Sequence, residues 1–314
     1  MVMQKIKISP NSKQRSAIEH PPSPLMILAG AGTGKTFTLE NRIVYLIKEY
    51  KVDPKHLLAI TYTEKAAKEL KNRVIEKVGA KAHSMTVNTF HAFCYKLLRD
   101  NDFSSKQLLD ESEAVHMFLT RFDELKPFES TEFPLDPQKA ITESFMPFFN
   151  RMRDELIDPE KVKVSQLKDD DTLTNETCQQ LSDLKRIYPL FQSWKEELNV
   201  VDYGDMILSA YQMISTNKSI LKNIQDNYRH IVIDEFQDNN FALNEIVNLI
   251  AGKRNYVTAV GDDDQVIYSF RGANNFNIQA FRERYGDHEK YQSIALETNY
   301  RSNQAILDLS LIHI

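Results

Sequence analysis

A glycine-rich loop between an apolar segment and a helix-like segment limits the fold of this chain more than any other feature of its sequence. The apolar segment LMILA (25–29) is followed by GAGTG (30–34) and then by KTFTLENRIVYLI (35–47), whose apolar residues recur at helical spacing. The chain has only nine glycines, and three of them lie between residues 30 and 34. Such a concentration indicates a backbone that must approach another group closely. The pattern therefore predicts a buried strand, a tight loop and a helix, in that order.

The loop has the composition of a phosphate-binding loop, in which backbone N–H groups surround phosphate oxygens and the next helix contributes its positive end. In this interpretation Lys35 reaches the β and γ phosphates of ATP, and Thr36 is a ligand of Mg²⁺. Ala29 occupies the position where a first glycine is usual. The alternative is a tight turn that binds no ligand. The residues expected to bind the nucleotide are Ala29, Gly30, Ala31, Gly32, Thr33, Gly34, Lys35 and Thr36.

Short apolar segments alternate with helix-like segments over much of the chain. This alternation predicts an α/β fold with a parallel sheet that is covered on both faces. Between residues 103 and 200 the pattern changes to helices with apolar faces, interrupted by prolines, and the aromatic residues there are expected to form a core. We therefore expect one α/β domain, residues 1–102 and 201–289, that is interrupted by a helical insertion.

Two adjacent carboxylates follow the apolar segment of IVIDEFQD (231–238). Asp234 is expected to hold Mg²⁺, and Glu235 to orient and deprotonate an attacking water, as phosphoryl transfer to water requires. An acidic pair at the end of a strand is otherwise a solvated turn. Together with the glycine-rich loop, the pair favours a nucleotide hydrolase over a small-molecule kinase.

Two further segments carry polar and aromatic side chains. VGDDDQVIYSFRGA (260–273) places three carboxylates after a strand, which indicates either a cation site or an acidic loop. In LETNYRS (296–302), Arg301 is expected to reach a γ phosphate and Tyr300 to stack on a base.

These four segments, with Gln14 placed 21 residues before Lys35, resemble the ordered motifs of superfamily 1 DNA helicases of the UvrD, Rep and PcrA type. The resemblance implies that ATP lies between two RecA-like lobes of the P-loop NTPase class. It implies that Gln14 reads the adenine, that Tyr300 stacks on the purine and that Gln265 senses the γ phosphate. Arg301 then links the nucleotide state to closure between the lobes.

The same resemblance implies contacts to single-stranded DNA or to junctions of single and double strands. The net charge is −5, so a uniformly basic surface does not hold the DNA, and stacking in a local groove takes its place. The alternative for each aromatic ring is packing in the core. Asp202, Tyr203 and Asp205 are weakly similar to a further family motif. The expected DNA contacts are Tyr62, Thr63, His91, Tyr268, Phe270 and Arg271.

The chain departs from the family pattern at several positions. Phe37 replaces a frequent basic residue, Glu64 a usual asparagine, and Phe270 a usual tryptophan. Glu64 would repel a nearby phosphate, whereas Phe270 keeps a face for stacking. Gly204 stands where an acidic residue is usual.

The sequence ends 13 residues after Arg301, so residues 290–314 are expected to be the truncated start of a second RecA-like lobe. The resemblance implies an ATP-dependent DNA helicase of repair or replication that moves 3′ to 5′, and a fragment that is itself inactive. Two alternatives are the motor of a helicase-nuclease, and a nucleotide-dependent DNA-binding module without turnover.

The sequence lacks an apolar run of the roughly 18 residues that a bilayer span requires. Its first residues also lack the apolar segment of a signal peptide. We therefore expect a cytoplasmic protein without a membrane partner, and the sequence does not indicate which proteins bind it.

Overall fold

The computed structural model describes residues 9–101, 106–162, 173–254, 256–262 and 276–303, which form two compact units. The first unit comprises residues up to Ala92, Ile214–Asn239 and the chain from Asn244 onward. The second comprises Phe93–Met213 and Asn240–Leu243. The second unit is longer than the helical insertion expected at residues 103–200. It also includes most of helix α4 (Phe90–Arg99) and most of helix α10 (Tyr203–Thr216).

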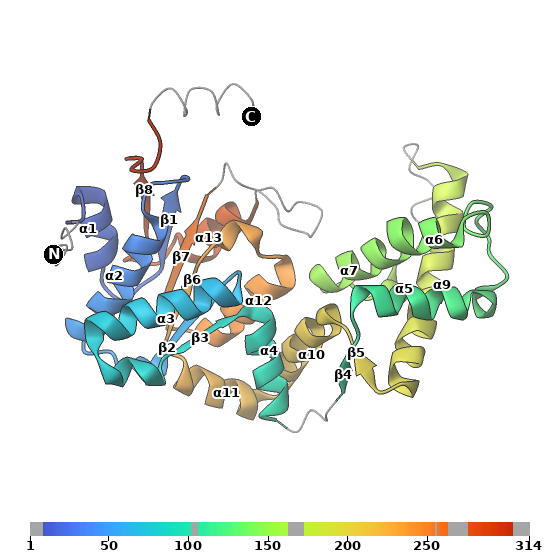
Figure 1. Cartoon of the computed structure of the whole chain (residues 1–314), viewed down its shortest axis with the longest axis horizontal. Helices are drawn as coiled ribbons and strands as arrows, with labels where there is room; N and C mark the ends of the chain where they lie inside the picture. Colours follow the sequence, from blue (N-terminus) through green and yellow to red (C-terminus); the bar gives the residue numbers. More distant parts are fainter. Residues whose placement is uncertain (1–8, 102–105, 163–172, 255, 263–275, 304–314) are drawn as a thin grey trace, which may run out of the picture. The chain divides into compact units, whose positions relative to one another are not determined.

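Within the described residues of the first unit, six strands form one sheet in the order β3-β2-β6-β7-β1-β8, and every neighbouring pair is parallel (Figure 1). This arrangement confirms the predicted α/β class. The strands are β1 (Leu25–Ala29), β2 (Leu57–Thr61), β3 (Thr86–Thr89), β6 (His230–Ile233), β7 (Val257–Gly261) and β8 (Gln292–Leu296).

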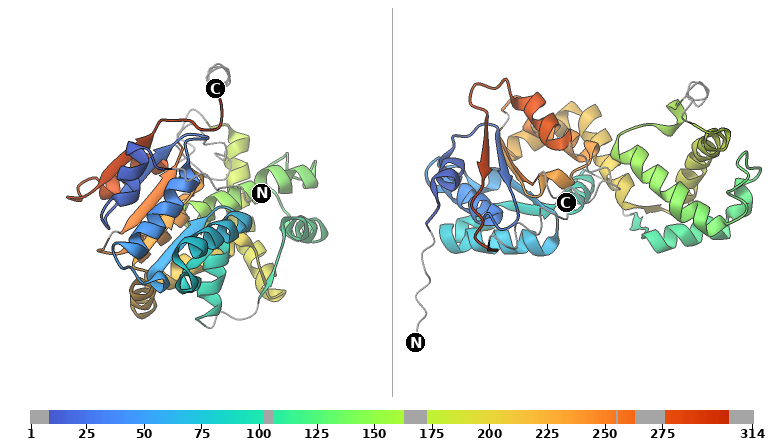
Figure 2. Two further views of the ribbon diagram at one scale, coloured as in Figure 1. Left: turned by 60° about the vertical axis from the view of Figure 1, so that its left-hand side comes forward. Right: turned by 90° about the horizontal axis from the view of Figure 1, so that it is seen from above.

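Both faces of this sheet are buried. Leu25 and Ile27 of β1 pack in one apolar cluster with Ile43 of α2 (Lys35–Lys48) and Val74 of α3 (Glu64–Val78). Helices α2 and α3 lie side by side there (Figure 2). Met26, whose side chain alternates to the other face, is also buried, as expected for parallel strands with apolar residues at successive positions.

Of the remaining helices of the first unit, α1 precedes the first strand and the others lie between strands. Asn11 caps α1 through a reciprocal pair of hydrogen bonds with Gln14, and Thr63 caps α3 by accepting a hydrogen bond from the backbone of Ala66. The helices not yet given bounds are α1 (Ser12–Glu19), α11 (Lys218–Asn227), α12 (Phe241–Ala251) and α13 (Phe276–Tyr285).

The strand β8 corrects the expected domain boundary. Its residues Gln292–Leu296 pair in parallel with all of β1, from Leu25 to Ala29. Pairing satisfies the backbone groups on the side of β1 that β7 leaves open. The sequence had suggested that residues 290–314 begin a second lobe. The pairing shows instead that residues 292–296 belong to the first sheet.

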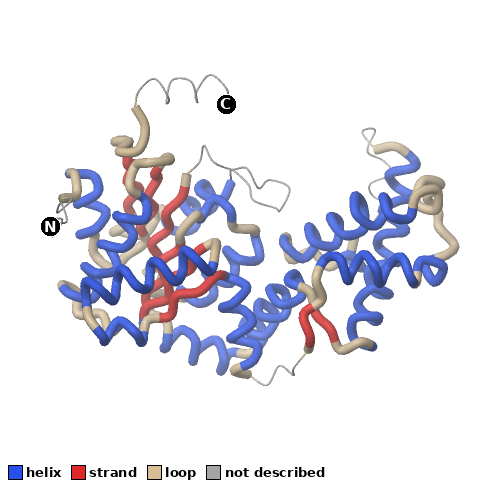
Figure 3. The backbone as a smooth tube through the Cα atoms, in the orientation of Figure 1, coloured by secondary structure: helices blue, strands red, loops and turns tan. Residues whose placement is uncertain are grey.

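The second unit is mainly helical and has its own core (Figure 3). Phe118, Phe191 and Trp194 are buried there, which confirms that the aromatic residues of the insertion form a core. Within the described residues, its α-helices and strands are most of α4, β4 (Gln107–Leu108), α5 (Glu111–Thr120), α6 (Pro137–Lys139), α7 (Met146–Asp154), α9 (Asn175–Glu197), β5 (Val200–Val201) and most of α10.

Helices of the described segments are either too short or too polar to cross a membrane. The carboxyl ends of the six parallel strands meet at one edge of the sheet, and ligands of open α/β sheets bind at that edge. The residues that follow each strand therefore lie where a ligand is expected to bind.

Candidate functional site

The glycine-rich loop joins β1 to α2 as a tight turn. Thr33 closes the turn, since its backbone N–H and its hydroxyl both donate to the carbonyl of Gly30, at 3.2 and 2.8 Å. Gly32 and Gly34 have φ angles of 79° and 87°, which glycine adopts far more readily than other residues. Within the described chain, no side chain caps the N-terminus of α2. The first N–H groups of this helix, where Thr36 is exposed, therefore form a site suited to an anion.

The acidic pair lies across from this loop, directly after β6. The Nζ of Lys35 is 3.0 Å from Oε2 of Glu235 and 4.0 Å from Oδ2 of Asp262, at the end of β7. Glu235 has a φ of 50° and a ψ of 46°, a left-handed conformation that costs a residue with a side chain about 1–3 kcal/mol. The structure thus brings the predicted lysine and carboxylates together, and the strain at Glu235 is typical of a functional turn.

Burial and like charge perturb the carboxyl groups of this turn. Burial, followed by the charge of Glu235, raises the pKa of Asp234 to about 6. The same two causes raise the pKa of Asp238 to about 6. Lys35 opposes both shifts without cancelling them. A divalent cation would supply the missing positive charge, so the residues present fit Mg²⁺.

The described residues contain no group of three histidine, cysteine or acidic side chains placed to hold a metal ion by themselves. Mg²⁺ is commonly bound by one or two carboxylates together with substrate phosphates.

Gln14 packs against the glycine-rich loop. Its Nε2 donates to the carbonyl of Thr33 at 3.0 Å, and its Oε1 accepts from the backbone of Asn11 at 3.1 Å. Only 3% of the residue is exposed, and a Cβ at Gly34 would lie 2.7 Å from its Nε2. Both ends of the amide are therefore bonded to protein, and adenine reading by Gln14 stays a prediction.

The segment after β8 also lies on this loop. The Nδ2 of Asn299 donates to the carbonyl of Ala31 at 2.6 Å, and the backbone N–H of Tyr300 donates to that of Gly32 at 2.8 Å. The hydroxyl of Tyr300 accepts from Nδ2 of Asn11, also at 2.8 Å, although 59% of Tyr300 is exposed. Tyr300 is thus brought beside the helix that carries Gln14. A Cβ at Gly32 would lie 2.7 Å from that of Arg301, so Arg301 is adjacent to the loop.

Asn11 and Asn299 were missed from sequence. Asn11 had a detectable signal, because an asparagine three residues before a glutamine is the pattern of a capping box. Asn299 fixes its own turn by accepting from the backbones of Arg301 and Ser302, at 2.8 Å each, a local role that asparagine often has.

The expected DNA contacts are described in part. Tyr62 and Thr63 follow β2 and are exposed, and His91, which follows β3, is exposed as well. Because β2 and β3 are parallel neighbours, these three residues share one end of the sheet. Gln265, Tyr268, Phe270 and Arg271 lie outside the described residues.

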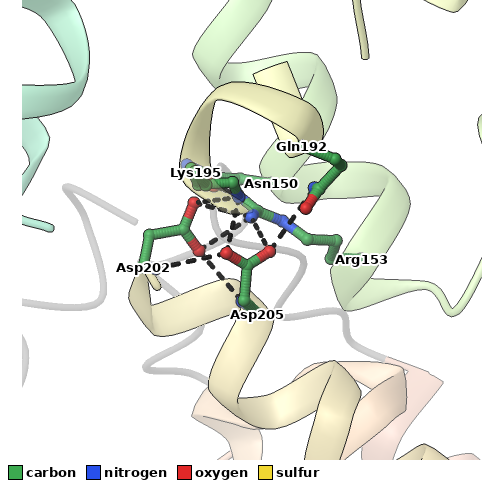
Figure 4. Close-up of polar contacts among 6 residues, drawn as sticks. All are labelled: Asn150, Arg153, Gln192, Lys195, Asp202 and Asp205. Atoms are coloured by element: carbon green, nitrogen blue, oxygen red, sulfur yellow. Dashed lines mark hydrogen bonds and ion pairs between the residues drawn. The ribbon is translucent and has the colours of Figure 1, made fainter. Parts of the chain in front are cut away.

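Asp202 and Asp205 form a buried ion cluster in the second unit (Figure 4). Arg153 of α7 lies 2.7 Å from Asp202 and 2.8 Å from Asp205, and Lys195 of α9 lies 3.1 and 2.5 Å from the same carboxylates. Burial alone would raise the pKa of Asp202, but the two cations lower it to about 2. The two aspartates thus neutralise cations from two other helices, whereas half of Tyr203 is exposed.

Comparison with known proteins supports the predicted resemblance. The chain is 31% identical to the probable DNA helicase II homolog of Mycoplasma capricolum subsp. capricolum over 304 residues, which are 96% of this chain and 40% of that protein. It is 33% identical to the ATP-dependent DNA helicase UvrD1 of Mycobacterium tuberculosis (strain ATCC 25618 / H37Rv) over 312 residues, 95% of this chain and 38% of that protein. It is 32% identical to DNA helicase II of Escherichia coli (strain K12) over 302 residues, which are 95% of this chain and 39% of that protein.

The chain thus spans about two fifths of the length of these relatives. The family model for the UvrD/REP helicase N-terminal domain matches residues 10–286. This match covers most of the chain and confirms the resemblance inferred from the motifs. The chain therefore belongs to the UvrD/REP helicase N-terminal domain family.

Proposed function

We propose that this chain is the N-terminal motor portion of a DNA helicase that couples ATP hydrolysis to movement on single-stranded DNA. The observation that carries the proposal is the approach of Lys35 to Glu235, at 3.0 Å, beside an uncapped helix N-terminus. A phosphate-facing cation, a carboxylate that can orient water and a helix N-terminus without a side-chain cap are parts that serve phosphoryl transfer to water.

Each residue then has a distinct role. Lys35 contacts the β and γ phosphates, and Glu235 orients the attacking water and accepts its proton. Thr36 and Asp234 are the residues that would hold Mg²⁺, which neutralises phosphate charge when bound. In the structure Glu235 is the partner of Lys35, so a phosphate replaces this carboxylate as the partner of the lysine and frees Glu235 for the water.

DNA binding is proposed for the strand ends that carry Tyr62, Thr63 and His91, together with Tyr268, Phe270 and Arg271. Stacking on aromatic rings depends little on base identity, which suits a motor that moves along any sequence. Movement 3′ to 5′, a role in repair or replication and a preference for strand junctions are proposed from the family resemblance alone. A cytoplasmic location is proposed from the sequence.

Equilibrium titration of the chain with a fluorescent ATP analogue and Mg²⁺ tests the nucleotide site. Lys35→Ala and Asp234→Ala should lose binding, because they remove the phosphate-facing cation and a carboxylate that would hold Mg²⁺. Glu235→Gln should still bind, since it keeps the shape of the side chain, but it should not hydrolyse ATP.

Lys48→Ala is the matched control, because Lys48 is exposed at the opposite end of the same helix. It should bind as the wild type does. Equal affinity of the wild type and Lys35→Ala would contradict the proposed site.

A further inference from the structure

Amide side chains form a buried network behind the turn that carries Glu235. Gln237, Asn239 and Asn277 are each less than a tenth exposed, and Asn244 is half-buried. A buried amide costs free energy unless its donors and acceptors are bonded, so the partners of these groups indicate what the network holds in place.

Gln237 connects Glu235 to the end of β7. Its Nε2 donates to Oε2 of Glu235 at 2.9 Å, the same oxygen that accepts from Lys35 at 3.0 Å. Its Oε1 accepts from the backbone N–H of Asp262 at 3.0 Å. The orientation of the Glu235 carboxylate therefore depends on where the backbone places Gln237.

Asn277 of α13 fixes that backbone. Its Nδ2 donates to the carbonyl of Gln237 at 3.1 Å and to that of Asn239 at 2.6 Å, so it holds the chain on both sides of Asp238. Its Oδ1 accepts from Nδ2 of Asn244 at 3.0 Å, and Oδ1 of Asn244 accepts from Nδ2 of Asn239 at 3.0 Å. Each of these three asparagines thus restricts the others.

We infer that Asn277 is a positioning residue for ATP hydrolysis, acting on Glu235 through Gln237. The inference rests on the proposed function, in which Glu235 is the base. Helix α13 directly follows residues 263–275 in sequence, and this segment contains Gln265, the residue expected to sense the γ phosphate. A change of nucleotide state that moves α13 would therefore reach the catalytic carboxylate through Asn277.

Asn277→Asp tests this inference. The aspartate keeps the size of the side chain and an acceptor for Asn244, but it replaces the amide donor by an oxygen that faces two carbonyl groups. Asn248→Ala is the control, because Oδ1 of Asn248 in α12 accepts from the hydroxyl of Tyr285 in α13 at 2.8 Å. It removes another bond between the same two helices without touching residues 235–239.

Two quantities are measured on the full chain: the affinity for a fluorescent ATP analogue, and the rate of single-turnover ATP hydrolysis with protein in excess. Asn277→Asp should bind nucleotide within about twofold of wild type and hydrolyse about 10- to 100-fold more slowly, the range expected when a catalytic group is displaced by about 1 Å. Asn248→Ala should hydrolyse within about twofold of wild type. Adding Asn277→Asp to Gln237→Ala should slow hydrolysis no further, because both act on the same carboxylate.

Hydrolysis by Asn277→Asp at the wild-type rate would overturn the inference, as would an equal loss in Asn248→Ala. A wild-type chain that binds no ATP would instead overturn the proposed function. This chain is expected to be inactive on its own, so amide hydrogen exchange decides the inference separately, both where the wild type binds no ATP and where it binds ATP without measurable hydrolysis. The N–H of Asp262 should exchange faster in Asn277→Asp than in wild type and Asn248→Ala, and unchanged exchange would overturn the inference.

Discussion

Asp154, the last residue of α7, should make the stability of the second unit depend on pH. Burial raises the pKa of its carboxyl group to about 7 from an ordinary 3.8, although Arg153 and Arg151 oppose the shift. Its Oδ1 accepts from Nδ2 of Asn240 at 2.5 Å, a bond that the protonated carboxyl group also allows. Between about pH 4 and pH 7, the folded chain therefore retains a proton that the unfolded chain has lost.

The sign and size of the effect follow from this difference. Where the folded state binds more protons, the free energy of unfolding falls as pH rises, so stability is lost from about pH 4 to pH 7. The full shift, from 3.8 to about 7, corresponds to about 4 kcal/mol. Because the carboxyl group is only partly buried, solvent screening reduces the expected loss to about 2 kcal/mol.

Urea unfolding of wild type and Asp154→Asn between pH 4 and pH 8 measures this loss. Asparagine keeps the oxygen that accepts from Asn240 and carries no charge at any of these pH values. Trp194, the one tryptophan of the sequence, is buried in the second unit and reports on its unfolding by fluorescence. Asp234 and Asp238 also have raised pKa values, but they are present in both proteins and cancel in the difference.

The stability of Asp154→Asn relative to wild type should therefore increase by about 2 kcal/mol from pH 4 to pH 8. A difference that stays constant over this range would show that Asp154 ionises as an exposed carboxyl group does. That result would refute the reasoning from burial.

Two further predictions concern the ion cluster and the DNA contact. Arg153→Met should lower the free energy of unfolding by about 3–5 kcal/mol in the same fluorescence assay. The change removes one of the two cations that contact the buried carboxylates of Asp202 and Asp205. Arg151→Met, which removes an exposed ion pair of the same helix, should cost less than about 1 kcal/mol. Phe270→Ala should weaken binding of single-stranded DNA by about 1–3 kcal/mol in fluorescence anisotropy, with nucleotide affinity unchanged, whereas unchanged DNA affinity would assign the ring to the core.

Features determined by neighbours in the sequence were predicted well. The strand, loop and helix at residues 25–48 follow from apolar spacing and glycine content, and the approach of Lys35 to Glu235 follows from the rule that parallel strands end at the same edge of a sheet. Each inference needed only a local pattern and one general property of α/β folds. Such local patterns predict the arrangement in space because the strands of a parallel sheet all end at the same edge.

Features that depend on contacts between distant segments were not predicted. The strand β8 has the same local pattern in either lobe, and only its pairing with β1 shows which sheet contains it. The bonds of Asn277 to the backbones of Gln237 and Asn239 join residues about 40 positions apart, and asparagine has no periodic pattern that indicates such partners. The hydrogen bond from the side-chain amide of Gln14 to the carbonyl of Thr33 was not predicted either, because it also joins residues that are distant in the sequence.

Gly204 shows how a departure from a family pattern is explained by a contact. From sequence it weakens the similarity of residues 202–205 to a family motif, since an acidic residue is usual there. In the structure a Cβ at this position would lie 2.7 Å from both Cζ and Nε of Arg153. The guanidinium that neutralises Asp202 and Asp205 therefore occupies the space that a side chain at residue 204 would need. A side chain at position 204 would require this guanidinium to shift within the ion cluster, so the contact with Arg153 explains why glycine suits this position in this chain.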